Sequence, residues 1–403
     1  MYKAIRLTLV WALAAAFLSG CWNRRELNEI AVTTTIGLDR LNDGNILLSD
    51  QLLYAPAISP IGGGGGGDRA PVTLLSETGE GIQLAARKMT MKVSKKIYVG
   101  QLQILVLGEK LARSGVADVL DHIARDHEYR RDFFVIVAKG MTANEVLRIF
   151  TPLESIPANK LRDSLDSSSK AWGASGAIQI GEFLSALTAK GQDPVLSGVT
   201  IQGNPEEGSE KESVARIQVR SELAYTGYAV FKKDRLLGWL NQRESKGVNY
   251  VRGKIKSTSV SVPCPEGKHT ITVELLNTKA KMKPKLVNGE PAVNVKISAE
   301  ASIADAQCNI DMSNPATINA IEKLVNEEIR DTVKDAVKTA QTDYKADIFG
   351  FGSAFARSKP KYWSGVEKKW SEAFPEIRVQ VSVSTKIREI FKTKRSLIRQ
   401  MRE

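Results

Sequence analysis

The sequence predicts a mixed α/β (α+β) protein of several domains, with mostly antiparallel or mixed sheets flanked by helices. Three observations predict this class. Strand-like and helix-like patterns alternate through the first half of the chain, which is typical of sheets covered by helices. A β-rich stretch follows, and then one long amphipathic helix with an alternating strand behind it. The 403 residues are enough for two or three domains at about 100 to 200 residues each, and we expect three.

Residues 1–20 have the composition of a lipoprotein signal peptide. Lys3 and Arg6 give a positive start, and residues 7–18 form an apolar run that is shorter than the roughly 20 residues needed to span a bilayer. The run leads into Leu18-Ser19-Gly20-Cys21, so we expect cleavage before the cysteine and a diacylglyceryl group on its thiol. Cys21 is then a membrane anchor and not a catalytic thiol. An ordinary secretory signal with a chance cysteine is the alternative.

Residues 21–202 are predicted to form an N-terminal α/β domain. Thr142 and Glu145 have capping-box spacing at the start of one of its helices. Six consecutive glycines at 62–67 predict a flexible loop, and a phosphate-binding loop is excluded because the Lys-Ser/Thr ending is missing. An apolar run extends over 97–107, and its stretch 104–107 is expected to be a buried strand. The other expected strands are 30–38, 45–54, 133–137 and 195–202, and the expected helices are 80–93, 116–125, 143–150 and 180–190.

A polar stretch at 203–213 is interpreted as a linker. Beyond it we expect a small β-rich middle domain over 214–257, with strands at 217–231 and 236–240.

A C-terminal α+β domain is predicted over 258–403. Several strands are expected within 260–302. The pair Asn314-Pro315 is the expected order of cap and first-turn proline, and apolar residues at every third or fourth position predict one long helix over about 315–349. Two glycines, Gly350 and Gly352, are expected to stop this helix, and alternation from Ile377 to Val383 predicts a half-buried strand.

The chain is basic, with 57 Lys and Arg against 45 Asp and Glu. A basic surface suits an anionic membrane leaflet or is simply solvated. Nucleic acid is not an expected partner, because no recognisable binding module with interleaved aromatics is present.

Two further cysteines, Cys264 and Cys308, lie near the ends of strand-like segments. In a compartment where disulfides persist they could bridge, or they could be two separately buried thiols.

The sequence shows no recognisable set of catalytic residues, no set of metal ligands and no cofactor-binding motif. The three histidines, His122, His127 and His269, do not form the H-E-x-x-H arrangement. The run Ser167-Ser168-Ser169-Lys170 matches S-x-x-K but lacks its companion motifs, and we interpret it as a polar loop. Ser175 stands in a string that fails the final glycine of G-x-S-x-G.

Several unusual strings occur in order along the chain. They are Cys21 to Leu27, Gly37-Leu38-Asp39, Arg125 to Arg130, Ala229 to Leu240, and Lys345 to Gly352 with Trp363, Trp370 and Phe374-Pro375 behind it. Together they resemble the C-subunit lipoproteins of spore germinant receptors, the Ger(x)C family. Departures are Asn23 where Asp is common, Ala356 where His is frequent, and the six-glycine run, which resembles an insertion.

The resemblance implies a three-domain, non-enzymatic lipoprotein on the outer face of the spore inner membrane. Its implied partners are membrane lipid and the A and B subunits of a germinant receptor, in which it would scaffold the receptor or relay its signal. The alternative is a lipoprotein that captures a solute for an uptake system. Such a protein would normally show two similar α/β lobes. Here the long C-terminal helix and its β-rich neighbour do not resemble the pattern of the N-terminal half.

Overall fold

The structure is a computed structural model that describes residues 2–6, 8, 26–54, 70–215, 217–264, 267, 269–308 and 314–389. Cys21, most of the signal segment and the glycine run at 62–67 lie outside these ranges. The predictions made for them therefore stay predictions.

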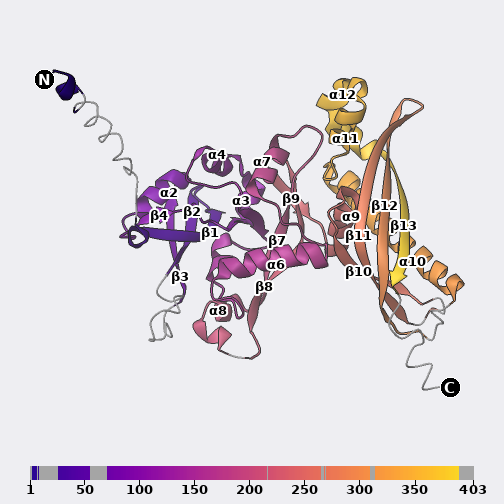
Figure 1. The fold of residues 1–403 in the computed structure, drawn as a ribbon, viewed down its shortest axis with the longest axis horizontal. Helices are drawn as coiled ribbons and strands as arrows, with labels where there is room; N and C mark the ends of the chain where they lie inside the picture. The colour runs from indigo at the N-terminus through magenta and orange to yellow at the C-terminus, as the bar shows by residue number, and fades with distance from the viewer. Residues whose placement is uncertain are drawn as a thin grey trace.

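Two sheets, each packed against helices, make up the described chain (Figure 1). The strands are β1 (Ile30–Arg40), β2 (Ile46–Leu53), β3 (Val72–Gly79), β4 (Lys96–Tyr98), β5 (Ile104–Gly108), β6 (Phe134–Ala138), β7 (Val195–Gly203), β8 (Ser221–Lys232), β9 (Arg235–Trp239), β10 (Ser257–Pro263), β11 (Thr270–Val287), β12 (Glu290–Ala306) and β13 (Arg378–Glu389). The helices are α2 (Ile82–Met89), α3 (Glu109–Ser114), α4 (Ala117–Arg125), α5 (Ala143–Arg148), α6 (Pro157–Ala171), α7 (Ile180–Thr188), α8 (Pro205–Gly208), α9 (Gln242–Arg252), α10 (Pro315–Thr339), α11 (Phe351–Ser358), α12 (Pro360–Val366) and α13 (Trp370–Ala373). Shorter helical turns are η1 (Leu27–Glu29), η3 (Lys211–Val214), η4 (Ala340–Tyr344), η5 (Glu367–Lys369) and η6 (Phe374–Glu376).

The first sheet has the order β3-β2-β1-β5-β6-β7-β8-β9, with β4 paired to β1. Its central strands β1, β5, β6 and β7 are parallel, and antiparallel strands extend it on both sides. Alternate residues of β5 enter different cores: Ile104 and Val106 share one with residues of α5 and α6, whereas Leu105 and Leu107 share the other with residues of α3 and α4. Helices therefore cover both faces, as central parallel strands require.

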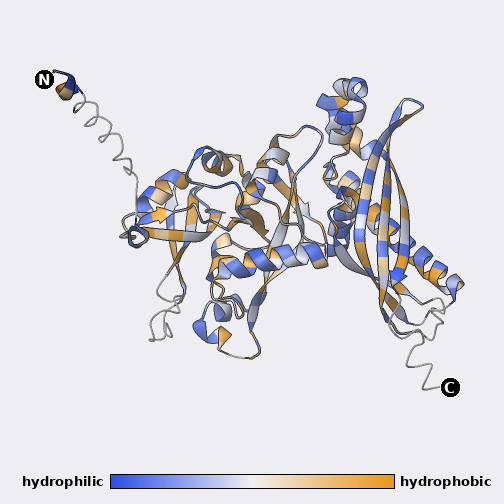
Figure 2. Ribbon diagram, in the orientation of Figure 1, coloured by the Kyte–Doolittle hydropathy of each residue, from blue (hydrophilic) through white to orange (hydrophobic). Residues whose placement is uncertain are grey.

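The second sheet has the order β10-β11-β12-β13. The hairpin of β11 and β12 turns at Asn288 and Gly289, whose φ angles of 52° and 86° are both positive, as a two-residue type I′ turn demands. The helix α10 packs against this sheet and against α9. Ile321, Val325 and Ile329 of its apolar stripe are buried. Figure 2 shows hydrophobic and hydrophilic residues alternating along the long strands of this sheet.

The mixed α/β fold class is confirmed. The capping box at Thr142 and Glu145 forms, with the Thr142 hydroxyl accepting from the Glu145 N–H at 3.1 Å, and Asn314 caps α10 ahead of Pro315. The buried strands predicted at 104–107 and 133–137 form as β5 and β6, and the apolar run that begins at residue 97 also contains part of β4.

The middle of the chain differs from the prediction. Residues 214–257 do not form a sheet of their own: β8 and β9 continue the first sheet from β7, and α9 packs on α10. Accordingly 203–213 is not an interdomain linker but a connection within one sheet that contains α8 and η3. An isolated two-stranded hairpin is at best marginally stable in water, which explains why β8 and β9 join the larger sheet. The domain boundaries themselves stay a proposal.

Two further differences concern helices. The long helix ends ahead of residue 349, because Lys345 takes a left-handed conformation with φ 48° after η4. The serine run around Ser168 is not a loop but part of α6. The sequence shows no clear apolar periodicity for α6, because its buried residues, Leu161 and Leu165 among them, are separated by polar ones.

Candidate functional site at the junction of the two sheets

A buried carboxylate, Asp347, organises the loop that follows α10 and η4. Its Oδ1 accepts hydrogen bonds from the backbone N–H groups of Phe349 (3.2 Å), Gly350 (2.9 Å) and Phe351 (3.1 Å). Its Oδ2 accepts from the N–H of Gly352 at 2.8 Å and from the indole N–H of Trp370 at 3.0 Å. One side chain thus satisfies the first N–H groups of α11, which would otherwise be buried without partners.

The same loop is joined to the segment between α7 and β7. The N–H of Asp347 donates to Oδ2 of Asp193 at 2.8 Å, and the N–H of Asp193 donates to the carbonyl of Asp347 at 2.8 Å. Beside them the N–H of Ser353 donates to the carbonyl of Gly191 at 2.9 Å. We call the loop Lys345–Gly352 with residues 191–193 and Trp370 the Asp347 junction.

Two glycines allow the backbones to meet at the junction. A Cβ on Gly352 would lie 2.5 Å from the Cα of Gly191 and 2.7 Å from the ring of Trp370. Gly191 has a φ of 80°, and a Cβ there would lie 2.5 Å from the ring of Trp363. Contacts this short exclude any side chain, so the predicted helix stop at Gly352 is instead a point of backbone contact.

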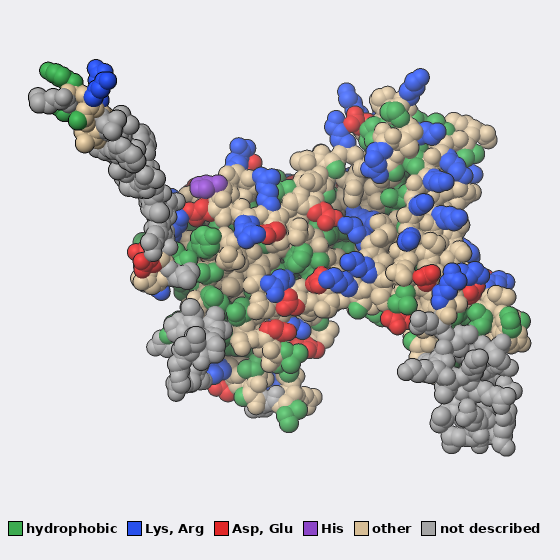
Figure 3. Space-filling model, in the orientation of Figure 1, with side chains coloured by type: hydrophobic (Ala, Val, Ile, Leu, Met, Phe, Trp, Pro, Cys, Tyr) green, Lys and Arg blue, Asp and Glu red, His purple; other side chains and the backbone are tan. Residues whose placement is uncertain are grey.

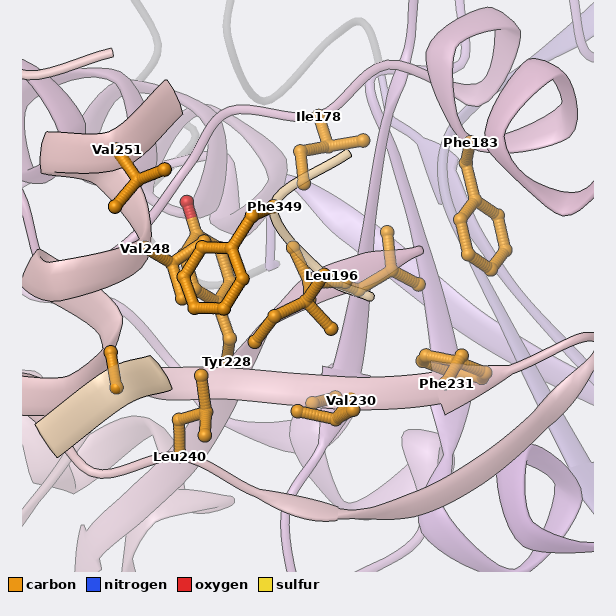
Figure 4. Packing of buried hydrophobic residues seen from close by; sticks show 14 of the residues in the cluster. Ile178, Phe183, Leu196, Tyr228, Val230, Phe231, Leu240, Val248, Val251 and Phe349 are labelled. Atoms are coloured by element: carbon orange, nitrogen blue, oxygen red, sulfur yellow. The ribbon is translucent and has the colours of Figure 1, made fainter. Parts of the chain in front are cut away.

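Aromatic side chains seal the junction from water. Phe349 and Phe351 stack with ring centroids 5.0 Å apart, and Trp363 meets Trp370 edge to face at 5.1 Å. Figure 4 shows the ring of Phe349 among Leu196, Tyr228 and Val248, which come from β7, β8 and α9. The C-terminal loop therefore inserts into the core shared with the first sheet.

Three further hydrogen bonds join the loop to neighbouring elements. Lys232 at the end of β8 donates to the carbonyl of Lys345 at 2.7 Å, and the guanidinium of Arg252 donates to the carbonyl of Ile348 at 2.8 Å. The hydroxyl of Tyr344 donates to the carbonyl of Trp239 at 2.9 Å. These bonds fix the last turn after α10 against β8, α9 and β9.

Burial dominates the electrostatics here. It raises the pKa of Asp347 to about 6, while the N–H donors of Gly352 and Phe351 oppose that rise. Burial likewise raises the pKa of Asp193 and lowers that of Arg252. The junction can hold a structural charge, and its carboxylates Asp193 and Asp347 both accept hydrogen bonds from backbone N–H groups.

A second buried carboxylate, Asp39, explains the string Gly37-Leu38-Asp39. Its oxygens accept from the N–H groups of Ala143 at 2.8 Å and Asn144 at 3.0 Å, at the start of α5. A Cβ on Gly108 would lie 1.9 Å from Oδ1 of Asp39. Burial raises the pKa of Asp39. Its role is to dock α5 on the first sheet.

A polar hollow of about 930 Å³ lies beside the string Arg125 to Arg130. Asp50 lies in its wall and is 2% exposed. Oδ2 of Asp50 accepts from the hydroxyl of Thr33 at 3.1 Å, and Oδ1 has no hydrogen-bond partner among the described residues. Burial raises the pKa of Asp50 to about 7, and burial followed by the charge of Asp50 raises that of Tyr129.

Of the three cysteines for which the sequence predicted a role, two lie within the described residues. Cys21 lies outside the described residues. Cys264 and Cys308 are both buried and joined as a disulfide, with Cα atoms 6.1 Å apart, a separation that suits such a bond.

The residues that resembled catalytic motifs are not assembled into sites. His122 and His127 each lie near Asp126, at 4.0 Å and 3.9 Å, and no group of three metal-binding side chains occurs in the described ranges. The hydroxyl of Ser175 pairs with that of Ser168 at 2.7 Å, and the ammonium of Lys170 pairs with Asp166. Within the described residues, Ser168 and Ser175 therefore hydrogen-bond to each other, and Lys170 is held by Asp166.

Sequence reasoning missed Asp347, Asp193 and Gly191 as functional residues. A local signal existed for Asp347, since a lone acid stands inside the apolar string Ala346 to Phe351. Its partners at 191–193 are remote in the chain and carry no pattern of their own.

The fold and the junction define a multidomain α/β protein whose buried polar residues join one unit to another. Within the described ranges, no helix combines the length and apolar character needed to cross a membrane.

The chain belongs to a family of spore germination proteins. Residues 23–201 match the family described as "Spore germination protein N-terminal domain", and residues 226–390 match "Spore germination B3/ GerAC like, C-terminal". Together these cover most of the chain. The second match begins within β8, so the first sheet receives strands from both matched segments. Members of the family are non-catalytic, and this chain is not an enzyme.

The relatives are similar over nearly the whole chain. "Spore germination protein KC" of Bacillus subtilis is 33% identical over 392 residues, covering 96% of both chains. "Spore germination protein B3" of the same organism is 25% identical, covering 92% of this chain and 94% of its own. The crystal structure of the GerBC protein has a similar fold, with a TM-score of 0.56 and 22% identity, covering 87% of this chain and 96% of that one.

Proposed function

We propose that this chain is the lipid-anchored C subunit of a nutrient germinant receptor, needed for spore germination. It acts as a scaffold or signal-relay component with A and B subunits on the outer face of the cell membrane or spore inner membrane. The observation that carries the proposal is the near full-length similarity to "Spore germination protein KC" at 33% identity.

The Asp347 junction supports a scaffold or relay role. Reciprocal bonds between Asp193 and Asp347, with Phe349 inserted beside β7 and β8, make the C-terminal loop part of the first core. A load on either sheet is then transmitted through packed side chains and buried hydrogen bonds to the other. A subunit without catalytic residues acts through what it holds in place.

The anchor at Cys21 is the second part of the proposal. Its support is the apolar run and the Leu18-Ser19-Gly20-Cys21 string. Two or three acyl chains hold a protein stably on a membrane where one does not, and confinement beside its partners raises the effective concentration, so that a modest interface suffices.

Labelling with a radioactive fatty acid tests the anchor. The parent chain is expected to be labelled, and Cys21→Ala is expected to be unlabelled and released from the membrane. The double variant Cys264→Ser/Cys308→Ser is the matched control and should keep the label. Equal labelling of Cys21→Ala and the parent, or full membrane retention of an unlabelled variant, would contradict the anchor.

Purification of a tagged chain from detergent-solubilised spore membranes tests the partners. A and B subunits should copurify. Recovery of a permease and an ATPase instead would favour a solute-binding protein of an uptake system.

A further inference from the structure

The outward face of the second sheet carries a regular row of lysines. Residues of β11 after its irregularity at 276–279 alternate between the core and solvent. Ala280 and Met282 pack against the core, whereas the lysines between and beside them are exposed. The exposed basic residues of this face are Lys279, Lys281, Lys283, Lys285, Lys296 and Arg378; we call them the basic face.

The spacing makes the basic face continuous. Alternate residues on a strand are about 7 Å apart, so the four lysines of β11 extend over roughly 20 Å. Lys296 of β12 is directly opposite Lys281, and Arg378 of β13 is beside Ala292, the partner of Lys285. Figure 3 shows Lys and Arg gathered over this part of the molecule with few acidic side chains among them.

The charges of this face are not neutralised within the described chain. Two ion pairs involve β13: Arg388 pairs with Glu300 of β12, and Lys386 pairs with Glu322 of α10. Both lie toward the end of β13 that is away from the hairpin turn. No acidic partner among the described residues pairs with the six members of the basic face. Like charges directly opposite each other, as at Lys281 and Lys296, disfavour the sheet. This arrangement therefore lowers stability unless an anion is present.

The turn of the same hairpin exposes apolar side chains. Leu286 is 42% exposed and Val287 is 46% exposed. They continue the strand that carries the lysines.

We propose that the basic face binds an anionic phospholipid surface, with Val287, which lies on the same face of β11 as the lysines, entering the headgroup region. Lysine is depleted in protein–protein interfaces, whose centres are apolar, so a face of lysines without an apolar centre suits a layer of phosphate groups better than a protein. The long side chains keep their ammonium groups in water while their stems cover apolar surface. The proposal does not depend on Cys21, although an anchored chain would hold this face near the bilayer.

A fluorescent probe at the hairpin turn tests the proposal. The full chain carrying Cys21→Ser and Val287→Cys is labelled with nitrobenzoxadiazole at the single free thiol. Vesicles consist of phosphatidylcholine alone or with about one third phosphatidylglycerol. Emission is expected to rise and shift to the blue only with the anionic vesicles, and the effect should fall at high salt. The neutral vesicles record whatever binding the rest of the chain contributes.

Paired variants locate the effect. Lys281→Gln/Lys283→Gln should weaken the anionic-vesicle response about fivefold per lysine, or about 25-fold. The control Lys95→Gln/Lys160→Gln removes the same charge from two positions outside the second sheet, one between α2 and β4 and one in α6. It should leave the response unchanged. Thermal melting of each variant checks that it folds.

Equal responses to both vesicles, equal losses in the two paired variants, or no response at all would overturn the proposal. Release of a copurifying membrane protein by Lys281→Gln/Lys283→Gln, with the probe remaining in water, would also overturn it and make the basic face a protein contact.

Discussion

Asp193 and Asp347 hold each other's backbones: each N–H donates to an oxygen of the other residue, and both distances are 2.8 Å. The two residues are remote in sequence: Asp193 lies between α7 and β7 of the first sheet, and Asp347 lies in the loop between η4 and α11. Asp347 also fixes the start of α11. One pair of residues thus orients a helix and joins two units, and this is the structural basis of the proposed relay.

Asp347→Asn should destabilise the protein by about 3 to 5 kcal/mol. An amide has one acceptor oxygen, so its NH₂ group would face N–H donors that now have no acceptor. Urea unfolding at neutral pH measures the loss. Asp331→Asn, at an exposed position of α10, is the control and should change stability by less than about 0.5 kcal/mol. Equal stabilities of the two variants would show that the junction is not structural.

Gly352→Ala should cost about 1 to 3 kcal/mol, because its Cβ would overlap Gly191 and Trp370. Gly365→Ala, where a Cβ would meet nothing within 4 Å, is the matched control and should be neutral or slightly stabilising within α12. Thermal melting compares them, and a Gly352→Ala variant as stable as the control would contradict the close approach.

Asp50 makes stability depend on pH. Its pKa is about 7 in the folded protein against 3.8 for an ordinary aspartate. Between these values the unfolded chain is ionised while the folded one holds its proton, so stability falls by up to about 1.4 kcal/mol per pH unit as pH rises from 4 to 7. Asp50→Asn should remove this fall.

Denaturant titrations of both proteins at pH 4 to 7 measure the effect of Asp50. The variant gains on the parent as pH rises, and the two agree at the acid end. Asp43→Asn, at an exposed turn where the pKa is lowered, should leave the slope unchanged above pH 4. Parallel slopes for Asp50→Asn and the parent would show that Asp50 is not buried as described.

The disulfide closes a loop with a sequence separation of 44 residues. The chain-entropy relation assigns about 4 kcal/mol to such a loop, and measured values are typically about 2 to 4 kcal/mol. In urea unfolding, the free energy of unfolding of Cys264→Ser/Cys308→Ser should be lower than that of the parent by about 2 to 4 kcal/mol. Mass spectrometry with a thiol reagent before and after reduction checks the bond, and ready labelling of the unreduced protein would contradict it.

The sequence predicts elements whose signals are local. Asn314-Pro315 and the stripe from Ile321 to Ile329 define α10, and Thr142 with Glu145 defines the start of α5. The alternating apolar residues of β13 predict a half-buried strand, because period-two alternation places the apolar side chains on one face of a strand.

Other elements were missed because their stability comes from distant partners. In α9 the buried positions include Ser245 and Asn249, which hydrogen-bond to the backbone of Tyr228 and to that of Gly173 and Ser175. Polar core residues of this kind give no hydrophobic periodicity. The role of Gly352 was missed for a similar reason, since Gly191 and Trp370 appear beside it only in the fold.

Germination of a deletion strain tests whether this chain is a receptor subunit needed for spore germination. Spores lacking this chain are exposed to each germinant separately and followed by loss of refractility, with the parent chain and Cys21→Ala restored as comparisons. We expect loss of the response to one germinant set, normal responses to the others, normal vegetative growth, and restoration by the parent chain only. Normal responses to every germinant in a strain with no second C subunit, or a nutrient-uptake defect in growing cells, would contradict it.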